Sequence, residues 1–221
     1  MATRAPLDVY LLPGLGADHR LFAKLELGEH RTHFLDWPRM RKGSTLSDFA
    51  RELASQVDKK RPHALVGVSM GGMVAQELAV LTGPERTVII SSWKGPHEMP
   101  PPIKLLRGTH PERLLTRQFI QASLPFMRWQ MGVEGQEAVK LFDELLEVHT
   151  VEQLQVQIDA VLHWDGPAKP VKDLVHLHGT SDRLMPILFI KDPVKVPKGG
   201  HFMVCQRAPQ VSRLVVEALA R

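Results

Sequence analysis

Residues 64–71 of this chain are Ala-Leu-Val-Gly-Val-Ser-Met-Gly, an apolar run that leads to Ser69 between two glycines. Apolar residues at helical spacing follow directly over residues 73–81. This order predicts a strand, a sharp turn with the serine at its tip, and a helix. Such a turn brings Gly67 and Gly71 so close to neighbouring backbone that side chains there would clash. Because unpaired N–H groups at a helix start favour negative charge, the sequence predicts a nucleophilic serine.

The first half of the chain alternates apolar runs with helical patterns. Strands are expected over residues 9–12, 32–35, 63–68 and 87–91, and helices over 20–25, 46–57 and 70–81. Thr45 and Asp48 have the spacing of a capping box at the start of the second of these helices. Strands that are almost wholly apolar and alternate with helices predict an α/β fold, with a mostly parallel sheet covered by helices on both faces.

The pattern changes after Trp93. Strand character returns only at 174–177 and 194–196, a loop is expected around 186–191, and a last helix is expected over 209–220. Residues 99–165 carry helical patterns and no strand. We therefore expect a core formed by residues 1–98 and 166–221, with residues 99–165 inserted as a block of helices between the fourth and fifth strands.

Composition limits the classes of partner and cofactor. The 221 residues are 43% hydrophobic and 24% charged, as in an ordinary soluble domain, and the net charge of +4 is not gathered into a long basic run. We therefore expect no nucleic-acid partner. Cys205 is the only cysteine, so neither a disulfide framework nor a cysteine-based metal site is expected. No carboxylate or histidine cluster has metal-ligand spacing in the sequence, and we predict neither a metal ion nor a cofactor.

The start of the chain has no hydrophobic signal region. Residues 1–6 lead directly into a strand-like segment, and no apolar run elsewhere approaches the length of a membrane span. The expected location is therefore the cytoplasm, without membrane association.

Two further residues complete the chemistry that a serine nucleophile needs. A serine hydroxyl requires a base within hydrogen-bond reach, and that base must be oriented by a third group. Asp182 follows the strand at 174–177, and His201 follows the strand at 194–196. Functional groups gather beyond the carboxyl ends of parallel strands, so all three side chains are expected to meet there. The order Ser, Asp, His along the chain is that of the α/β-hydrolases.

A serine that attacks an acyl group also needs donors for the oxyanion that forms. The N–H of Met70, directly after the serine, is one candidate. The other is the N–H of Leu15, because Pro13-Gly14-Leu15-Gly16 follows the first strand. Asp36 also ends a strand but precedes the serine in sequence, which makes it a less suitable acid than Asp182.

These motifs resemble those of the α/β-hydrolase fold over nearly the whole chain. The resemblance implies that Ser69 is the nucleophile, Asp182 the acid and His201 the base, that Leu15 and Met70 form the oxyanion hole, and that residues 99–165 are a cap domain. Two features depart from the family pattern. Pro13-Gly14 stands where many members carry His-Gly, and no antiparallel strands precede Val9, so the core has a trimmed N-terminus.

The resemblance implies a small serine esterase that cleaves a carboxylic ester, or a related acyl bond, through an acyl-enzyme. Thioesterase, carbon–carbon hydrolase and lyase chemistry use the same three residues on this fold, and a low-turnover receptor that keeps the pocket is a further alternative. The expected partner is a small-molecule acyl substrate, and the chain is expected to be a monomer or homodimer. Substrate contacts are expected from His19, Trp93, Trp129 and Phe202.

Overall fold

The computed structural model describes residues 5–221 and contains one six-stranded sheet with every neighbouring pair of strands parallel. The strands are β1 (Asp8–Leu12), β2 (Arg31–Phe34), β3 (His63–Val68), β4 (Arg86–Ile90), β5 (Leu174–Gly179) and β6 (Val194–Val196). Their order across the sheet is β2-β1-β3-β4-β5-β6. The predicted α/β class is confirmed, and all six expected strands form within two residues of their expected bounds.

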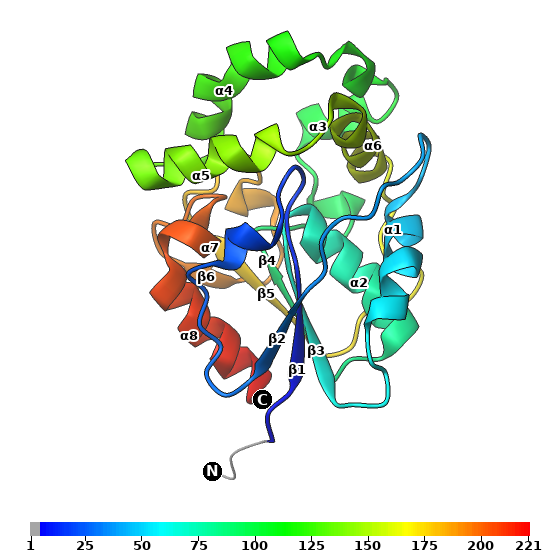
Figure 1. Ribbon diagram of the computed structural model, residues 1–221, viewed down its shortest axis with the longest axis vertical. Coiled ribbons are helices and arrows are strands. Elements are labelled where there is room, and N and C mark those ends of the chain that lie inside the picture. The colour runs from blue at the N-terminus through cyan, green and yellow to red at the C-terminus, as the bar shows by residue number, and fades with distance from the viewer. Residues whose placement is uncertain (1–4) are drawn as a thin grey trace.

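Helices cover both faces of this sheet (Figure 1). The helices that pack on it are α1 (Leu46–Leu53), α2 (Met70–Thr82), α7 (Met203–Gln206) and α8 (Ala208–Leu219), with the short 3-10 turns η1 (His19–Phe22), η2 (Ala54–Gln56) and η5 (Ile187–Phe189) in the connections. Successive residues of β1 point to opposite faces. Val9 and Leu11 therefore enter the core beneath α8, whereas Tyr10 and Leu12 enter the core beneath α1 and α2.

Two elements differ from the expectation drawn from the sequence. Strand β2 lies at the edge of the sheet and all four of its residues are exposed, so it is not one of the apolar strands that the pattern favoured. The helix expected over residues 20–25 is only the 3-10 turn η1, which the Asp18 side chain caps. In contrast, the capping box at Thr45 and Asp48 forms as predicted and starts α1.

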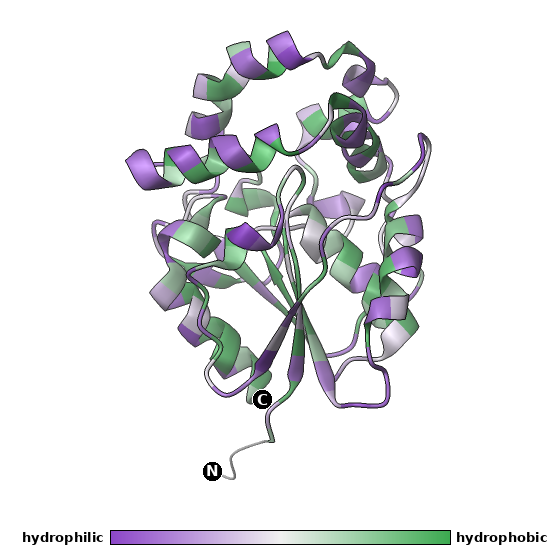
Figure 2. Ribbon diagram, in the orientation of Figure 1, coloured by the Kyte–Doolittle hydropathy of each residue, from purple (hydrophilic) through white to green (hydrophobic). Residues whose placement is uncertain are grey.

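The chain between β4 and β5 is helical, and its helices lie over the carboxyl ends of the strands (Figure 1). These elements are η3 (Pro96–Glu98), α3 (Pro101–Leu106), η4 (Pro111–Leu114), α4 (Arg117–Met131), α5 (Gln136–Glu147) and α6 (Val151–Leu162). We call them the inserted helices. Hydrophilic and hydrophobic residues alternate along them as in amphipathic helices (Figure 2). Among residues 5–221, no helix is long and apolar enough to cross a membrane.

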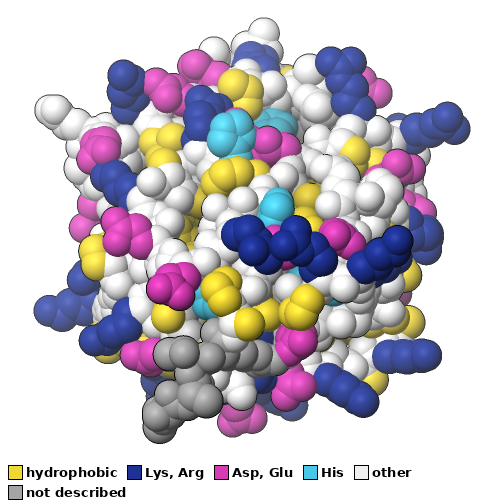
Figure 3. Space-filling view, turned by 60° about the horizontal axis from the view of Figure 1, so that its bottom comes forward, with side chains coloured by type: hydrophobic (Ala, Val, Ile, Leu, Met, Phe, Trp, Pro, Cys, Tyr) yellow, Lys and Arg dark blue, Asp and Glu magenta, His cyan; other side chains and the backbone are white. Residues whose placement is uncertain are grey.

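The opposite end of the sheet is charged. At the amino end of β1 the buried Asp8 carboxylate binds the Arg31 side chain at 2.9 Å and lies 3.2 Å from that of Arg61. Figure 3 brings this end of the molecule forward and shows lysine and arginine side chains across it, among acidic and hydrophobic ones. The inserted helices thus cover the carboxyl ends of the strands, whereas the amino ends lie at the charged end of the molecule.

Candidate active site

Ser69 lies at the tip of the turn between β3 and α2, in a backbone conformation that side chains rarely adopt, with φ of 54°. A Cβ atom added to Gly67 would lie 2.2 Å from the carbonyl oxygen of Gly71, and one added to Gly71 would lie 2.2 Å from that of Pro13. Both contacts are far shorter than van der Waals distance, so a side chain at either position would force the backbone to shift. The turn therefore requires glycine at both positions, as the sequence predicts.

The hydroxyl of Ser69 meets two side chains from distant strand ends. Nε2 of His201 lies 3.0 Å from the Ser69 Oγ, and Nδ1 of His201 lies 2.8 Å from Oδ2 of Asp182. His201 and Asp182 are buried, with exposed fractions of 2% and 4%. The structure thus brings the three predicted residues into one hydrogen-bonded chain beyond the carboxyl ends of β3, β5 and β6.

The Asp182 carboxylate is held in its ionised form. Burial opposes its ionisation, but the charge of His201, its hydrogen bond and the Met185 N–H, which donates to Oδ1 at 2.7 Å, outweigh burial and lower the pKa of Asp182. An ionised acceptor at Nδ1 fixes the imidazole tautomer that leaves Nε2 free to take a proton. This geometry suits a serine and base pair that act on an electrophile.

Two buried histidines, His178 and His176, form a hydrogen-bonded pair next to Asp182. Nε2 of His178 lies 2.7 Å from the Met185 carbonyl oxygen and 3.6 Å from Oδ2 of Asp182. A nitrogen facing a carbonyl must carry the hydrogen, so Nδ1 of His178 accepts, and Nε2 of His176 donates to it across 3.1 Å. Burial lowers the pKa of His178, which favours this neutral form. The sequence gives both histidines structural or solvated roles, and the structure buries both.

The loop after β1 lies directly beside the serine. A Cβ on Gly14 would stand 3.5 Å from Cβ of Ser69, and Nε1 of Trp37 donates to the Gly14 carbonyl oxygen at 2.9 Å. Within residues 5–221, the N–H groups of Leu15 and Met70 take part in none of the backbone hydrogen bonds. Two unpaired donors beside a hydroxyl form a suitable binding place for a developing negative charge.

Gln157 is a residue of this site that sequence reasoning missed. Its Oε1, on α6, accepts a hydrogen bond of 2.9 Å from the N–H of Gly16, and its side chain is buried. Gly16 directly follows Leu15, so an inserted helix holds the loop that carries one of the two unpaired donors. No sequence signal identifies this contact, because the two residues are 141 positions apart.

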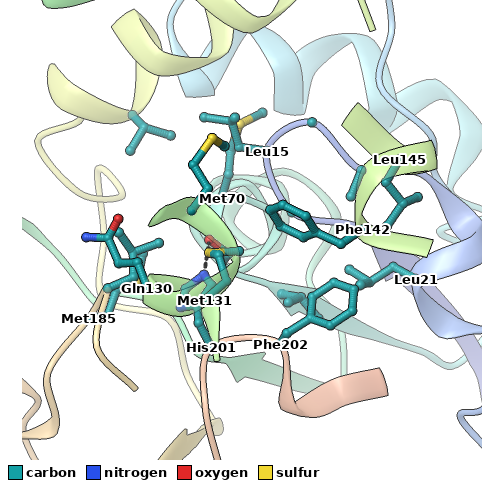
Figure 4. A pocket seen from close by; sticks show the side chains of 18 of the residues that line it. Leu15, Leu21, Met70, Gln130, Met131, Phe142, Leu145, Met185, His201 and Phe202 are labelled. Carbon is teal, nitrogen blue, oxygen red and sulfur yellow. Dashed lines mark hydrogen bonds between the residues drawn. The ribbon is translucent and has the colours of Figure 1, made fainter. Parts of the chain in front are cut away.

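An apolar cavity of about 270 Å³ opens beside the Ser69 hydroxyl, with the inserted helices as its roof. Figure 4 shows Leu15, Met70, Phe142 and Phe202 converging on the space next to His201. The roof side chains come from α3, α4, α5 and α6, and they include Ile103, Met127, Met131, Phe142, Leu145, Leu146, Ile158, Val161 and Leu162. Sequence reasoning named none of these roof residues as pocket residues.

Of the four residues expected to contact substrate, two line the cavity and two lie outside it. Trp93 and Phe202 are buried and line the cavity. His19 lies outside it, where its exposed ring is bonded to Asp36 at 2.8 Å. Trp129 also lies outside the cavity and is exposed, with the Arg183 guanidinium 5.0 Å from its ring centre.

Comparison with known proteins gives one family match and many structural matches. The model of the alpha/beta hydrolase family matches residues 9–213, which is nearly the whole chain. No curated protein matches the sequence significantly.

Solved structures resemble the chain over most of its length. An esterase from Thermogutta terrifontis superposes with a TM-score of 0.75 at 18% identity, covering 98% of this chain and 90% of the esterase. A hydrolase from Pseudomonas aeruginosa PA01 gives 0.75 at 16% identity, with 99% and 92% covered. A type II thioesterase of the yersiniabactin pathway gives 0.64 at 20% identity, with 99% and 95% covered. At these identities the likeness establishes a shared fold.

Proposed function

We propose that this chain, which belongs to the alpha/beta hydrolase family, is a serine hydrolase that cleaves a carboxylic ester or related acyl bond through an acyl-enzyme on Ser69. The hydrogen-bonded chain from Ser69 through His201 to Asp182, at the floor of an apolar cavity, is the observation that carries this proposal. The esterase and thioesterase folds of the structural matches are compatible with it.

The proposed reaction begins at the 3.0 Å contact between Nε2 of His201 and the Ser69 hydroxyl. His201 takes the hydroxyl proton as the oxygen attacks the acyl carbon, and Asp182 stabilises the imidazolium that forms. The N–H groups of Leu15 and Met70 donate to the oxyanion. His201 then gives the proton to the leaving alcohol or thiol. Water, activated by His201, attacks the acyl-enzyme and releases the acid.

The inserted helices act in this proposal as a cap that selects the acyl group. The cavity they roof is apolar and holds about 270 Å³, just below the range of about 300–1,000 Å³ that is typical of small-molecule sites. Such a space accepts an uncharged acyl chain of limited length. A charged acyl group would lose hydration and find no charged partner in the roof, because the roof side chains facing it are aliphatic, thioether and aromatic apart from the amide of Gln130.

A series of p-nitrophenyl esters, from acetate to dodecanoate, tests this function. We expect kcat/KM to rise with chain length while apolar area is being buried and to fall once the chain exceeds the cavity. The matching acyl thioesters, assayed in parallel, decide between ester and thioester as the preferred bond.

Two variants serve as references for that series. Ser69→Ala removes the proposed nucleophile and should lose all turnover above background, whereas Ser55→Ala changes an exposed serine and should leave it unchanged. Absence of hydrolysis with every ester and thioester would contradict the proposal and favour a binding protein.

A further inference from the structure

Gln130 brings an amide into the otherwise apolar lining of the cavity. Apart from Ser69, His201 and the indole of Trp93, the other side chains that line the cavity are aliphatic, aromatic or thioether groups. Gln130 lies on α4 and is half-buried. Within residues 5–221, its side-chain amide forms no hydrogen bond with the protein. Its N–H and carbonyl groups are therefore both available to a molecule that occupies the cavity.

Two hydrogen bonds hold the end of α4 against the loops that carry the acid and the base. The carbonyl oxygen of Trp129, just before Gln130, accepts from the Arg183 side chain at 2.7 Å, in the loop after β5. The carbonyl oxygen of Met131, just after Gln130, accepts from the N–H of Phe202 at 3.0 Å, in the loop after β6. Gln130 is thus fixed on the side of the site that β5 and β6 form.

The order of the strands places the oxyanion donor Leu15 on the other side of the serine. Leu15 follows β1, which is one neighbour of β3, the strand that leads to Ser69. The loops of the acid and the base follow β5 and β6, which lie beyond β4, the other neighbour of β3. In the proposed reaction His201 gives its proton to the leaving alcohol or thiol, so the leaving group lies on the His201 side. Gln130 is on that same side.

The labelled side chains around His201 separate two parts of the cavity. Figure 4 shows Gln130 and Met185 on one side of His201, and Leu21, Phe142, Leu145 and Phe202 on the other. The second group is wholly hydrocarbon, and the rings of Phe142 and Phe202 meet edge to face with their centres 5.8 Å apart. That part suits an acyl chain. The part with Gln130 offers an amide instead.

We propose that Gln130 selects the leaving group, by hydrogen-bonding a carboxamide that the leaving alcohol or thiol carries. This inference rests on the proposed acyl transfer at Ser69. A substrate that fills the cavity excludes water from the Gln130 amide, and an amide that loses water without gaining a partner destabilises the complex. A secondary carboxamide has one donor and one acceptor, which match those of Gln130. A leaving group of hydrocarbon alone leaves the Gln130 amide unpaired.

A charged leaving group suits this part of the cavity less well. The lining contains no lysine, arginine, aspartate or glutamate among the residues that the structure describes. Arg183 is exposed, and its guanidinium lies over the outward-facing Trp129 ring, 5.0 Å from the ring centre. A charge beside Gln130 would therefore lose hydration without an opposite charge to replace it.

The sequence predicts Trp129 as a substrate contact, and the structure places its neighbour Gln130 in the lining instead. Successive residues of a helix point about 100° apart, so only one of the two can face the cavity. A polar residue of an amphipathic helix is expected at the surface, and the helical period alone gives Gln130 no role.

The test compares two esters of one fatty acid whose leaving alcohols have nearly the same size. The 2-acetamidoethyl ester carries a carboxamide in its leaving group, and the 4-methylpentyl ester has hydrocarbon in its place. We expect Gln130→Met to lower the ratio of kcat/KM for the first ester to that for the second by about 5-fold or more. Because this ratio is compared between two proteins, the difference in intrinsic reactivity of the esters cancels. The two corresponding thioesters are assayed in the same way.

Gln121→Met is the matched control, since Gln121 lies on the same helix but is exposed and outside the lining. It should leave both rates unchanged. Gln130→Met should hydrolyse the 4-methylpentyl ester at least as fast as the native chain, which shows that the variant is folded. An unchanged ratio in Gln130→Met, or an equal loss with both esters, would overturn this inference and leave the proposed hydrolysis standing. Absence of hydrolysis of every ester by the native chain would overturn both.

Discussion

At the residue scale, Ser69 is held in a strained conformation by its surroundings. A non-glycine residue in such a region costs about 1–3 kcal/mol, which neighbouring contacts must offset. The Ser69 N–H donates to the Ile90 carbonyl oxygen at 2.9 Å, and the Ser92 hydroxyl donates to the Ser69 carbonyl oxygen at 2.7 Å. These two bonds fix the peptide on each side of the hydroxyl, so its position beside His201 is set before any substrate arrives.

Replacing Gly67 by alanine tests how tightly this turn is packed. The added Cβ would lie 2.2 Å from the Gly71 carbonyl oxygen, so backbone must shift. We expect the free energy of unfolding to fall by about 1–3 kcal/mol or more, and the proposed ester hydrolysis to slow with it. Urea unfolding followed by circular dichroism measures the change.

Gly108→Ala is the control for that substitution. A Cβ at Gly108 meets no atom within 4 Å, and its φ is not positive, so stability should stay within about 1 kcal/mol of the native chain. Equal stability of Gly67→Ala and Gly108→Ala would show that the turn tolerates side chains, contrary to the steric account.

Residue-scale features were the most predictable from sequence. The glycines around Ser69 are predictable because the tight turn has no room for side chains there. The strand-end positions of Asp182 and His201 follow from the parallel sheet. The support from Met185 and from the His176 and His178 pair could not be predicted, because it depends on side-chain directions inside the core.

At the element scale, the inserted helices are bonded to the loops that carry the site. Besides the Gln157 contact to Gly16, the carbonyl oxygen of Met131, at the end of α4, accepts from the N–H of Phe202 at 3.0 Å. The Arg183 side chain, next to Asp182, donates to the Trp129 carbonyl oxygen on α4 at 2.7 Å. Movement of these helices would therefore shift the loops beside the serine and the histidine.

The Gln157→Leu variant distinguishes the effect of the hydrogen bond between Gln157 and Gly16 from the effect of side-chain packing. Leucine fills much of the space but leaves the Gly16 N–H without an acceptor, which costs about 1–3 kcal/mol. Because Gly16 adjoins the proposed oxyanion donor Leu15, kcat for the preferred ester should fall by about 10-fold or more, with a smaller change in KM. Steady-state kinetics gives both values.

Glu152→Leu, on the exposed side of the same helix, provides the comparison. It should leave kcat unchanged. If Gln157→Leu lowered stability but left kcat at the native value, the contact would be structural only.

Element positions were largely predictable, whereas their exposure and mutual contacts were not. The apolar pattern located a helical block over residues 99–165, and the strand bounds agree within two residues. The pattern did not reveal that β2 is an exposed edge or which residues of α6 face the cavity. Both properties depend on packing between segments that are distant in sequence.

At the scale of the whole molecule, buried carboxylates lie at both ends of the sheet. Asp182 is at the carboxyl end and Asp8 at the amino end. Hydrogen bonds from Arg31 and then His33 lower the pKa of Asp8 well below its usual range, although burial opposes this shift. Both groups therefore have a lower pKa in the folded chain than the value of about 3.9 expected in the unfolded chain.

Acid should destabilise the chain through these groups. A carboxylate with a depressed folded-state pKa contributes stability that is complete above its unfolded pKa and is lost as the pH falls toward its folded pKa. The free energy of unfolding should therefore decline as the pH falls below about 4. Urea unfolding between about pH 7 and pH 3 measures this slope.

The Asp8→Asn variant measures how much of this pH dependence of the free energy of unfolding comes from Asp8. It should be less stable than the native chain at neutral pH, and it should lose less stability on acidification, because one of the two groups no longer titrates. If the free energy of unfolding fell equally steeply with pH in the native chain and in the variant, the pH dependence could not be assigned to Asp8.

The most direct test of the proposed function is covalent labelling with a fluorophosphonate, followed by intact mass and peptide mapping. A serine activated by His201 should take up one phosphonyl group per chain, located on Ser69, and Ser69→Ala should take up none. Ser55→Ala should label as the native chain does. A native chain that stays unlabelled, or a Ser69→Ala chain that labels equally well, would contradict nucleophilic catalysis by Ser69.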